Sequence, residues 1–499
     1  MNDRRIDYVL YALFAVCIAR FWLMALPSSY WVDELVTLFM IQHPHHASLD
    51  IAPQLSASVY YWLPWLSSKA LGTSEIALRI PSVAMAGVAL YYVAKLAERL
   101  IHPDAKWFAV AACLLLGNFD YFAADARPYA LGMAVACASV YYLVRWFDTG
   151  WWRDELVFVA LAALMWYIHL LFWPFYLVCA VYAIYRFAEG DGEAGPLQLA
   201  TATVSLAALL APLAFTALKM SRGASAHAFV AVPDAMALFL VSGANLLVYF
   251  TVALGVVRLF LKGKPESRTS GPSLVLFALW WLACPVGLFA YSRLSNNGVL
   301  IPRYVAPMLP GMALLATAIA AWLMPPRLWK LAAAVVAVAA LILVPDWNVV
   351  WPSHGGEGWR EAARLESGMA AEDTPVLCPS PFVEAQPPVW TSGYQLPGFL
   401  YANLAHYPLR GKALLLPFVE SPESDRFMAQ LLASRLVPAG KFLLYGEQLQ
   451  INYVYGWLRQ RPELATWHSE AYHSGSVFVV VYNASTIAGT TWKRSPTMP

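Results

Sequence analysis

The sequence predicts a polytopic α-helical membrane protein with a small C-terminal α/β domain, and three observations carry this prediction. The 499 residues are 60% hydrophobic and only 13% charged, whereas soluble globular proteins have about 25% charged residues. Long apolar runs recur between residues 8 and 345. From residue 346 onward, charged residues and Pro-rich turns return. The composition excludes an ordinary soluble enzyme, and the change near 346 separates two domains.

The first domain, residues 1–345, is expected to cross the membrane about eleven times. A helix needs about 20 apolar residues to span the hydrocarbon core of a bilayer. The segments of suitable composition are 8–26, 80–97, 107–123, 129–147, 155–169, 170–187, 197–217, 235–260, 273–291, 304–324 and 328–345.

Basic residues in the loops between these segments predict the orientation. With the N-terminus in the cytoplasm, fourteen Lys and Arg residues fall on the cytoplasmic side and seven on the other. This distribution agrees with the positive-inside rule. Eleven spans then place the C-terminal domain, residues 346–499, outside the cytoplasm.

The C-terminal domain is expected to be a small α/β fold. Trp359–Met369 has the pattern of an amphipathic helix, and Thr374–Cys378, Lys441–Tyr445 and Ser476–Tyr482 have that of short strands. Cys378 is the one cysteine of this domain, so no disulfide can form within it.

Composition also limits the partners and cofactors. The net charge of +2 comes without a basic stripe or tail, which argues against a nucleic-acid partner. His43, His45 and His46 lie close together but lack a carboxylate in register, and no Cys/His cluster exists. We therefore expect no metal and no required cofactor, although the sequence leaves a divalent ion open.

Polar side chains gather where the predicted spans reach the external side. Charges at membrane depth cost about 2.5–3.5 kcal/mol each on insertion scales, so each needs an explanation. The residues concerned are Asp33, Glu34, Arg79, Asp125, Arg127, Tyr129, His169, Arg303 and Tyr304.

Each of these residues also has an ordinary structural explanation. Acids favour the N-terminus of a helix, and arginines can extend to the lipid headgroups. Asp33 and Glu34 would point roughly 100° apart on a helix, so one of them is expected to face the site and the other a structural partner. Together, however, acids and arginines on one face suit an anionic substrate group beside a carboxylate base.

The order of motifs resembles that of the GT-C superfamily of membrane glycosyltransferases. The chain has Asp33-Glu34 after the first span, then Arg79-Ile80-Pro81, Asp125-Ala126-Arg127-Pro128-Tyr129, Tyr167-Ile168-His169, Pro302-Arg303-Tyr304 and, in the tail, Gly358-Trp359-Arg360-Glu361. It is most similar to the group that holds dolichyl-phosphate-mannose–protein mannosyltransferases and lipid A aminoarabinose transferases. The family often has His-Pro-Pro-Leu in the first external loop, 27–79, where this chain has Ala52-Pro53-Gln54-Leu55.

The resemblance implies an enzyme of the cell inner membrane that transfers a sugar from a polyprenyl-phosphate carrier, in contact with membrane lipids. The acceptor would be a lipid, glycan or protein on the external face, and inversion is expected. Asp33 matches the family's catalytic base, with Glu34 beside it, and Asp125 the second acidic position. Arg79, Arg127 and Arg303 match the phosphate-binding arginines, and Tyr129, His169 and Tyr304 stand in the same substrate-binding motifs.

Three other kinds of function are compatible with the composition. A transporter or flippase of lipid-linked sugars would carry acids or broken helices near mid-span, whereas these spans are almost free of charge, Arg20 being the main exception. An O-antigen ligase-type transferase would share the membrane location. A structural scaffold would not need the clustered acids and arginines.

Overall fold

The computed structural model describes residues 3–51, 58–221, 230–261, 263, 265, 269–385, 398–417 and 420–484. The segment Ala52–Leu55, where the sequence departs from the family pattern, lies outside these residues. The chain divides into two compact units: the first comprises Met1–Ser28, Met40–Pro44 and Ala52–His354, the second Ser29–Phe39, His45–Ile51 and Gly355–Pro499. Part of the first loop therefore clusters with the C-terminal residues.

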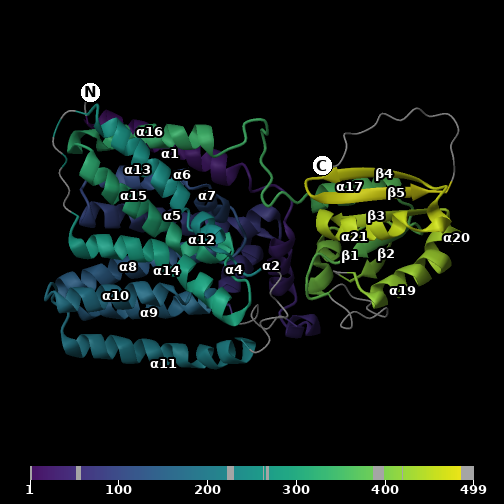
Figure 1. Ribbon diagram of the computed structural model, residues 1–499, viewed down its shortest axis with the longest axis horizontal. Coiled ribbons are helices and arrows are strands. Elements are labelled where there is room, and N and C mark those ends of the chain that lie inside the picture. Colours follow the sequence, from purple (N-terminus) through teal and green to yellow (C-terminus); the bar gives the residue numbers. More distant parts are fainter. Residues whose placement is uncertain are drawn as a thin grey trace. The chain divides into compact units, whose positions relative to one another are not determined.

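The first unit is a bundle of apolar helices (Figure 1). Its longer helices are α1 (Asp3–Ile18), α5 (Glu75–Leu100), α6 (Ala105–Leu115), α8 (Tyr129–Thr149), α9 (Trp152–Ile168), α10 (Phe175–Ala188), α11 (Pro196–Ser221), α13 (Ala244–Arg258), α14 (Gly271–Ser295), α15 (Leu309–Leu323) and α16 (Trp329–Leu343). Its shorter helices are η1 (Ala19–Leu23), η3 (Val59–Tyr61), α4 (Trp62–Leu71), α7 (Gly117–Ala123), η4 (Leu170–Phe172), α12 (Ala235–Val241), η6 (Pro302–Met308) and η7 (Pro326–Leu328).

The described residues contain eight helices long and apolar enough to cross a membrane, or nine if the bent pair α12 and α13 forms one span. All eleven predicted segments are largely helical. Two of them are shorter than a membrane-spanning helix. Helix α6 has 11 residues and ends before Leu116, and α9 has 17 residues. The polytopic fold is confirmed, and the number of crossings stays a prediction.

The most deeply buried helices of the bundle are α8 and η6 with α15. In each, 83% of the apolar membrane-spanning stretch is buried, against 11% in α11. Small residues allow this close packing. Gly132 of α8 faces the ring of Phe172 so closely that a Cβ there would lie 2.4 Å from it. Figure 1 shows α11 at the edge of the unit. The interior is therefore a packed core, and α11 is positioned to face lipid.

Arg20, the charge that stands out in the first span, is held by the chain itself. It is 7% exposed, and its Nη2 donates to the carbonyl oxygens of Asp346 and Val349, each at 2.9 Å. Its guanidinium also lies 5.1 Å from the ring centroid of Trp347. Arg20 thus fixes the segment after α16 and has a structural explanation.

The second unit contains a five-stranded sheet of order β2-β1-β3-β5-β4. The strands are β1 (Pro375–Pro379), β2 (Lys412–Leu416), β3 (Lys441–Glu447), β4 (His468–Ser474) and β5 (Val477–Asn483). β1 pairs in parallel with β2 and β3, while β5 pairs antiparallel with β3 and β4. The predicted strands at 374–378, 441–445 and 476–482 are therefore present.

Helices accompany this sheet, and the amphipathic helix expected at 359–369 is α17 (Trp359–Met369). The others are η2 (Ala47–Ile51), η8 (Phe399–Tyr401), α18 (Ala402–His406), α19 (Pro422–Leu431), η9 (Leu432–Leu436), α20 (Val437–Ala439), α21 (Gln448–Arg459) and η10 (Pro462–Leu464). Helix α2 (Val32–Gln42) begins in the second unit and ends in the first. The α/β character of the tail is confirmed, with α2 and η2 added to it.

Candidate functional site

The two adjacent acids of the first loop occupy the first turn of α2 and differ in exposure. Glu34 is fully buried, and its Oε2 accepts a hydrogen bond of 3.3 Å from the backbone N–H of Trp31, just before the helix begins. This is the capping contact of an acid in the third helical position. Asp33, in the second position, is half-buried. The helix start therefore gives Glu34 a structural task and leaves Asp33 as the more accessible carboxylate.

In the first unit, Asp125 and Arg127 occupy the tight turn between α7 and α8. Asp125 is fully buried, and Arg127 is 9% exposed. The backbone N–H of Arg127 donates to the carbonyl oxygen of Asp125 at 2.8 Å, and Pro128 then leads into the helix. This backbone contact closes the turn, and both residues therefore lie at the N-terminal end of α8.

His354, the last residue of the first unit, lies against Asp125. Its Nε2 is 3.3 Å from the Asp125 Oδ1, and its ring stacks on Tyr121 with centroids 4.2 Å apart. Its backbone N–H donates to the Ser28 Oγ at 2.9 Å. The imidazole is only 3% exposed. His354 and Asp125 therefore form a buried pair from segments far apart in the chain.

Arg79 is buried completely and is tied to the end of the first span. Its Nη1 donates to the carbonyl oxygens of Ala25, Leu26 and Ser28 at 3.2, 2.9 and 2.8 Å, and to the Ser28 Oγ at 3.0 Å. A guanidinium engaged with backbone carbonyls holds the chain after η1. These contacts are structural, and a phosphate-binding role for Arg79 stays a prediction.

His169, Tyr129 and Tyr304 form an aromatic group beside this turn. The ring centroid of His169 lies 5.1 Å from that of Tyr304 and 6.3 Å from that of Tyr129. The His169 Nδ1 accepts the backbone N–H of Leu171 at 3.2 Å, which fixes the ring. Arg303, half-buried, stacks its guanidinium 5.4 Å from the ring centroid of Tyr304. The structure therefore brings the predicted residues of α8, η4 and η6 together.

All the predicted site residues of the first unit lie at one end of its bundle, since Arg79 precedes most of α5, Asp125 to Tyr129 precede or begin α8, and Arg303 precedes α15. Asp33 and Glu34 belong to the second unit. The prediction therefore divides into two groups: a carboxylate pair on α2, and a cationic and aromatic group around the start of α8.

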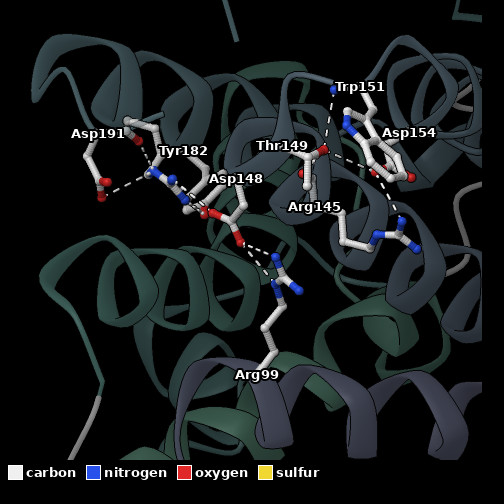
Figure 2. A network of polar contacts seen from close by, with 9 residues as sticks. Arg99, Arg145, Asp148, Thr149, Trp151, Asp154, Tyr182 and Asp191 are labelled. Atoms are coloured by element: carbon white, nitrogen blue, oxygen red, sulfur yellow. Dashed lines mark hydrogen bonds and ion pairs between the residues drawn. The ribbon is translucent and has the colours of Figure 1, made fainter. Parts of the chain in front are cut away.

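The opposite end of the bundle carries ion pairs of a different kind (Figure 2). Asp148, at the end of α8, accepts from Arg99 Nε and Nη2 at 2.9 and 2.6 Å and from Arg186 Nη2 at 3.0 Å. Arg145 pairs with Asp154 at 3.4 Å. Here each of these arginines has a carboxylate partner, which favours helix fastening over anion binding.

Two polar residues at the end of the bundle that carries Asp125 were not among the predicted site residues. His354 stands alone in the tail without a recognisable motif, and its partner Asp125 is 229 residues away. Asp120 is 3% exposed and accepts the Trp22 Nε1 hydrogen bond at 2.7 Å. The one signal for Asp120 was an acid inside an apolar segment, which needs a partner.

Of the three histidines at 43–46, His46 makes local contacts. The Nδ1 of His46 lies 2.8 Å from the Ser48 Oγ and accepts the Ser48 backbone N–H at 3.1 Å. Its ring also contacts that of Phe39 at 5.3 Å. These contacts cap the short helix η2, and a metal-binding role gains no support from them.

Comparison with known proteins shows that a family model matches part of the chain. Residues 56–215 match the family model described as dolichyl-phosphate-mannose-protein mannosyltransferase. This segment includes Arg79, the Asp125–Tyr129 turn and His169. No curated protein sequence matches the chain.

Two crystal structures of ArnT from Cupriavidus metallidurans have a similar fold over 97% of this chain and 99% of theirs. The apo structure is 12% identical with a TM-score of 0.55, and the structure bound to undecaprenyl phosphate is 13% identical with a TM-score of 0.54. Together with the family model, these likenesses confirm the predicted GT-C fold and the resemblance to GT-C glycosyltransferases.

Proposed function

We propose that the chain is an inner-membrane glycosyltransferase that moves a sugar from a polyprenyl-phosphate donor to an acceptor on the external face. The observation that carries this proposal is the collection of arginines, Asp125 and His169 at one end of an apolar helix bundle with the GT-C fold. The ArnT structure of the same fold binds undecaprenyl phosphate, which supports a donor of that class. The donor sugar would be a hexose or a pentose.

The reaction would exchange one bond at the anomeric carbon. An acceptor hydroxyl oxygen bonds to this carbon from the face opposite the phosphate, so that the configuration inverts. The bond from the carbon to the phosphate oxygen breaks, and its electron pair leaves with the polyprenyl phosphate. Asp33 takes the hydroxyl proton, a contribution of about 10²–10⁴-fold for a well-placed base. An acceptor that is already a phosphate would need no such proton transfer.

Arginines would stabilise the departing phosphate. Negative charge grows on the phosphate oxygens as the bond breaks, and a fixed guanidinium interacts more strongly with that charge than with the ground state. We assign this task first to Arg303, which is half-buried, and next to Arg127. Asp125, buried with His354, would hold the turn that carries Arg127. This scheme requires no metal or cofactor.

Asp33→Asn, which keeps the shape of the side chain and removes the base, tests this function. In protein reconstituted in nanodiscs and given labelled polyprenyl-phosphate sugars with lipid and glycan acceptors, we expect the variant to lose about 10²-fold or more in kcat. Glu34→Gln is the matched control, because Gln can still accept the Trp31 N–H. It should keep most of the activity.

Near-normal turnover by Asp33→Asn would contradict Asp33 as the base. If neither the wild-type protein nor Glu34→Gln transfers sugar from any of the donors, this result would contradict the transferase function itself. Passage of the lipid-linked sugar across a bilayer without transfer would favour the flippase instead.

The proposed topology, with the N-terminus in the cytoplasm and the second unit outside, is tested by cysteine labelling. All six native cysteines are buried, so a surface cysteine should be labelled selectively. On intact spheroplasts, we expect a membrane-impermeant maleimide to label Ser469→Cys in β4 and to leave Glu189→Cys, after α10, unlabelled until lysis. The reverse pattern would overturn the orientation.

A further inference from the structure

The second unit encloses the segment that leads into α2. The backbone N–H of Tyr30 donates to the hydroxyl of Tyr407 at 3.0 Å. The backbone N–H of Arg360, in α17, donates to the Ser29 Oγ at 3.2 Å. The two residues that precede the helix by two and three positions are therefore both tied to the C-terminal part of the chain.

Glu357 makes the next contact, directly beside Asp33. Its Oε2 accepts the backbone N–H of Val32, the first residue of α2, at 2.8 Å and the Trp359 Nε1 at 2.5 Å. Glu357 is 9% exposed. A free N–H at a helix start has no partner within the helix. Glu357 supplies that partner at the residue next to the proposed base.

Within the second unit, the backbone at Gly355 also fits closely around the segment that leads into α2. Gly355 has φ +72°, and a Cβ on it would lie 2.4 Å from the Cβ of Trp31. Glycine adopts this left-handed conformation without strain and leaves room for the tryptophan. Residues 29 to 32 are therefore each contacted by the chain between Gly355 and Arg360 or by Tyr407.

We propose that the C-terminal unit serves to position the Asp33 carboxylate, and that Glu357 is the positioning residue that does so. The inference rests on the proposed function, in which Asp33 is the base. Glu357 acts by fixing the start of α2, so it needs no contact with substrate. The second unit would then fix the position of the base at the start of α2, whatever else it binds.

The charge state of Glu357 suits this task. The pKa of Glu357 is raised to about 8, chiefly by burial; the hydrogen bonds from Trp359 and Val32 oppose this shift, and the neighbouring carboxylates of Glu447 and Asp33 add to it. Near neutral pH, Glu357 can therefore accept both hydrogen bonds without repelling the Asp33 carboxylate. Above about pH 8, its ionisation places a second negative charge beside the base.

Three variants separate positioning from general stability. Glu357→Leu removes the acceptor, whereas Glu357→Gln keeps a neutral one. Glu366→Leu is the matched control, because Glu366 is another buried carboxyl of the same unit and accepts the N–H groups of Arg410 and Gly411, each at 2.9 Å.

In the full-length protein, we expect Glu357→Leu to lose about 10²-fold in kcat, as a small misplacement of a catalytic group can cost. The KM should stay close to the wild-type value, because Glu357 does not touch substrate. Glu357→Gln should keep the wild-type kcat at pH 7. Above about pH 8, its kcat should fall less than that of the wild-type protein, because Gln cannot ionise. Folded Glu366→Leu should keep the wild-type kcat.

Amide hydrogen exchange reads the contact without any substrate. Peptides covering 29–36 should exchange faster in Glu357→Leu, while those covering 409–412 should exchange faster in Glu366→Leu. Unchanged exchange at 29–36, or equal kcat losses in the two Leu variants, would overturn the proposal. Faster exchange at 29–36 in Glu357→Leu, together with a wild-type protein that shows no sugar transfer, would uphold the contact that fixes the start of α2 and would count against the transferase alone.

Discussion

At the scale of single residues, similar side chains lie in different surroundings. Arg79 and Arg303 each directly precede a predicted span, and the family resemblance implies phosphate binding for both. Arg79 is fully buried and engaged with three backbone carbonyls, whereas Arg303 is half-buried and stacks on Tyr304. Burial and partner type, which spacing alone does not reveal, distinguish a structural arginine from one that can meet a ligand.

The two arginines should therefore respond differently to substitution. We expect Arg303→Ala to weaken binding of undecaprenyl phosphate by 10-fold or more, about 1.4 kcal/mol per factor of ten, with little change in thermal stability. Arg79→Ala should instead lower stability, since each buried carbonyl left without a donor costs about 1–3 kcal/mol. Lipid titration and thermal unfolding in detergent measure both effects. Unchanged lipid affinity in Arg303→Ala would remove it from the phosphate site.

At the scale of elements, the sheet shows which strands a sequence reveals. β3 and β5 carry buried apolar runs, and β1 has all five residues buried, so their patterns were recognised. β4, His468 to Ser474, was missed because it is an edge strand of mostly polar residues. It is a strand through its pairing with β5, which the sequence pattern does not reveal. β2 was missed because Lys412-Ala-Leu-Leu-Leu lacks the β-branched residues typical of strands.

The same limit applies to the candidate site. The Asp125–Tyr129 turn and His169 could be predicted because Pro128 and the helix ends lie nearby in the sequence. The division of labour between Asp33 and Glu34 could be expected, but which residue took which task depended on where α2 begins. His354 could not be predicted, because its relation to Asp125 arises only when the chain after α16 returns to the start of α8.

Helix ends away from the site should tolerate loss of charge poorly, because Asp148 connects α5, α8 and α10. We expect Asp148→Asn to lower the free energy of unfolding by roughly 1–3 kcal/mol, since it weakens the hold on the buried Arg186. Arg426→Ala should change it by less than about 1 kcal/mol, because the Arg426–Glu423 pair is exposed. Equal effects in chemical unfolding would contradict the fastening role.

At the scale of the whole molecule, the chain combines an apolar helix bundle with a second compact unit built around a five-stranded sheet. The second unit is held without disulfides, because all six cysteines are free and only Cys378 lies in it. Its stability depends on an apolar core around the sheet and on buried carboxyls such as Glu357 and Glu366. Buried ionisable groups make such a unit sensitive to pH.

Glu357 gives this sensitivity a definite sign. Its folded-state pKa, about 8, lies above the ordinary value of 4.5, so the folded protein binds this proton more tightly than the unfolded chain. The contribution is fully favourable below about pH 4.5 and is lost as the pH rises through about 8. We expect the unfolding temperature of the second unit to fall between pH 6 and pH 9, and to fall less in Glu357→Gln. Equal slopes in both proteins would contradict this assignment.

The division of the chain also has a consequence for biosynthesis. The segment Ser29–Phe39 emerges from the ribosome early, yet the residues that surround it begin at Gly355. At about 5–20 residues per second, roughly 15 to 60 s separate the two events. During this interval the nascent chain has its membrane helices, but the Asp33 segment lacks its contacts with the C-terminal residues; if Asp33 is the base, as proposed, activity is expected only when translation is nearly finished. A chain truncated before the sheet would then insert into the membrane without the proposed transferase activity.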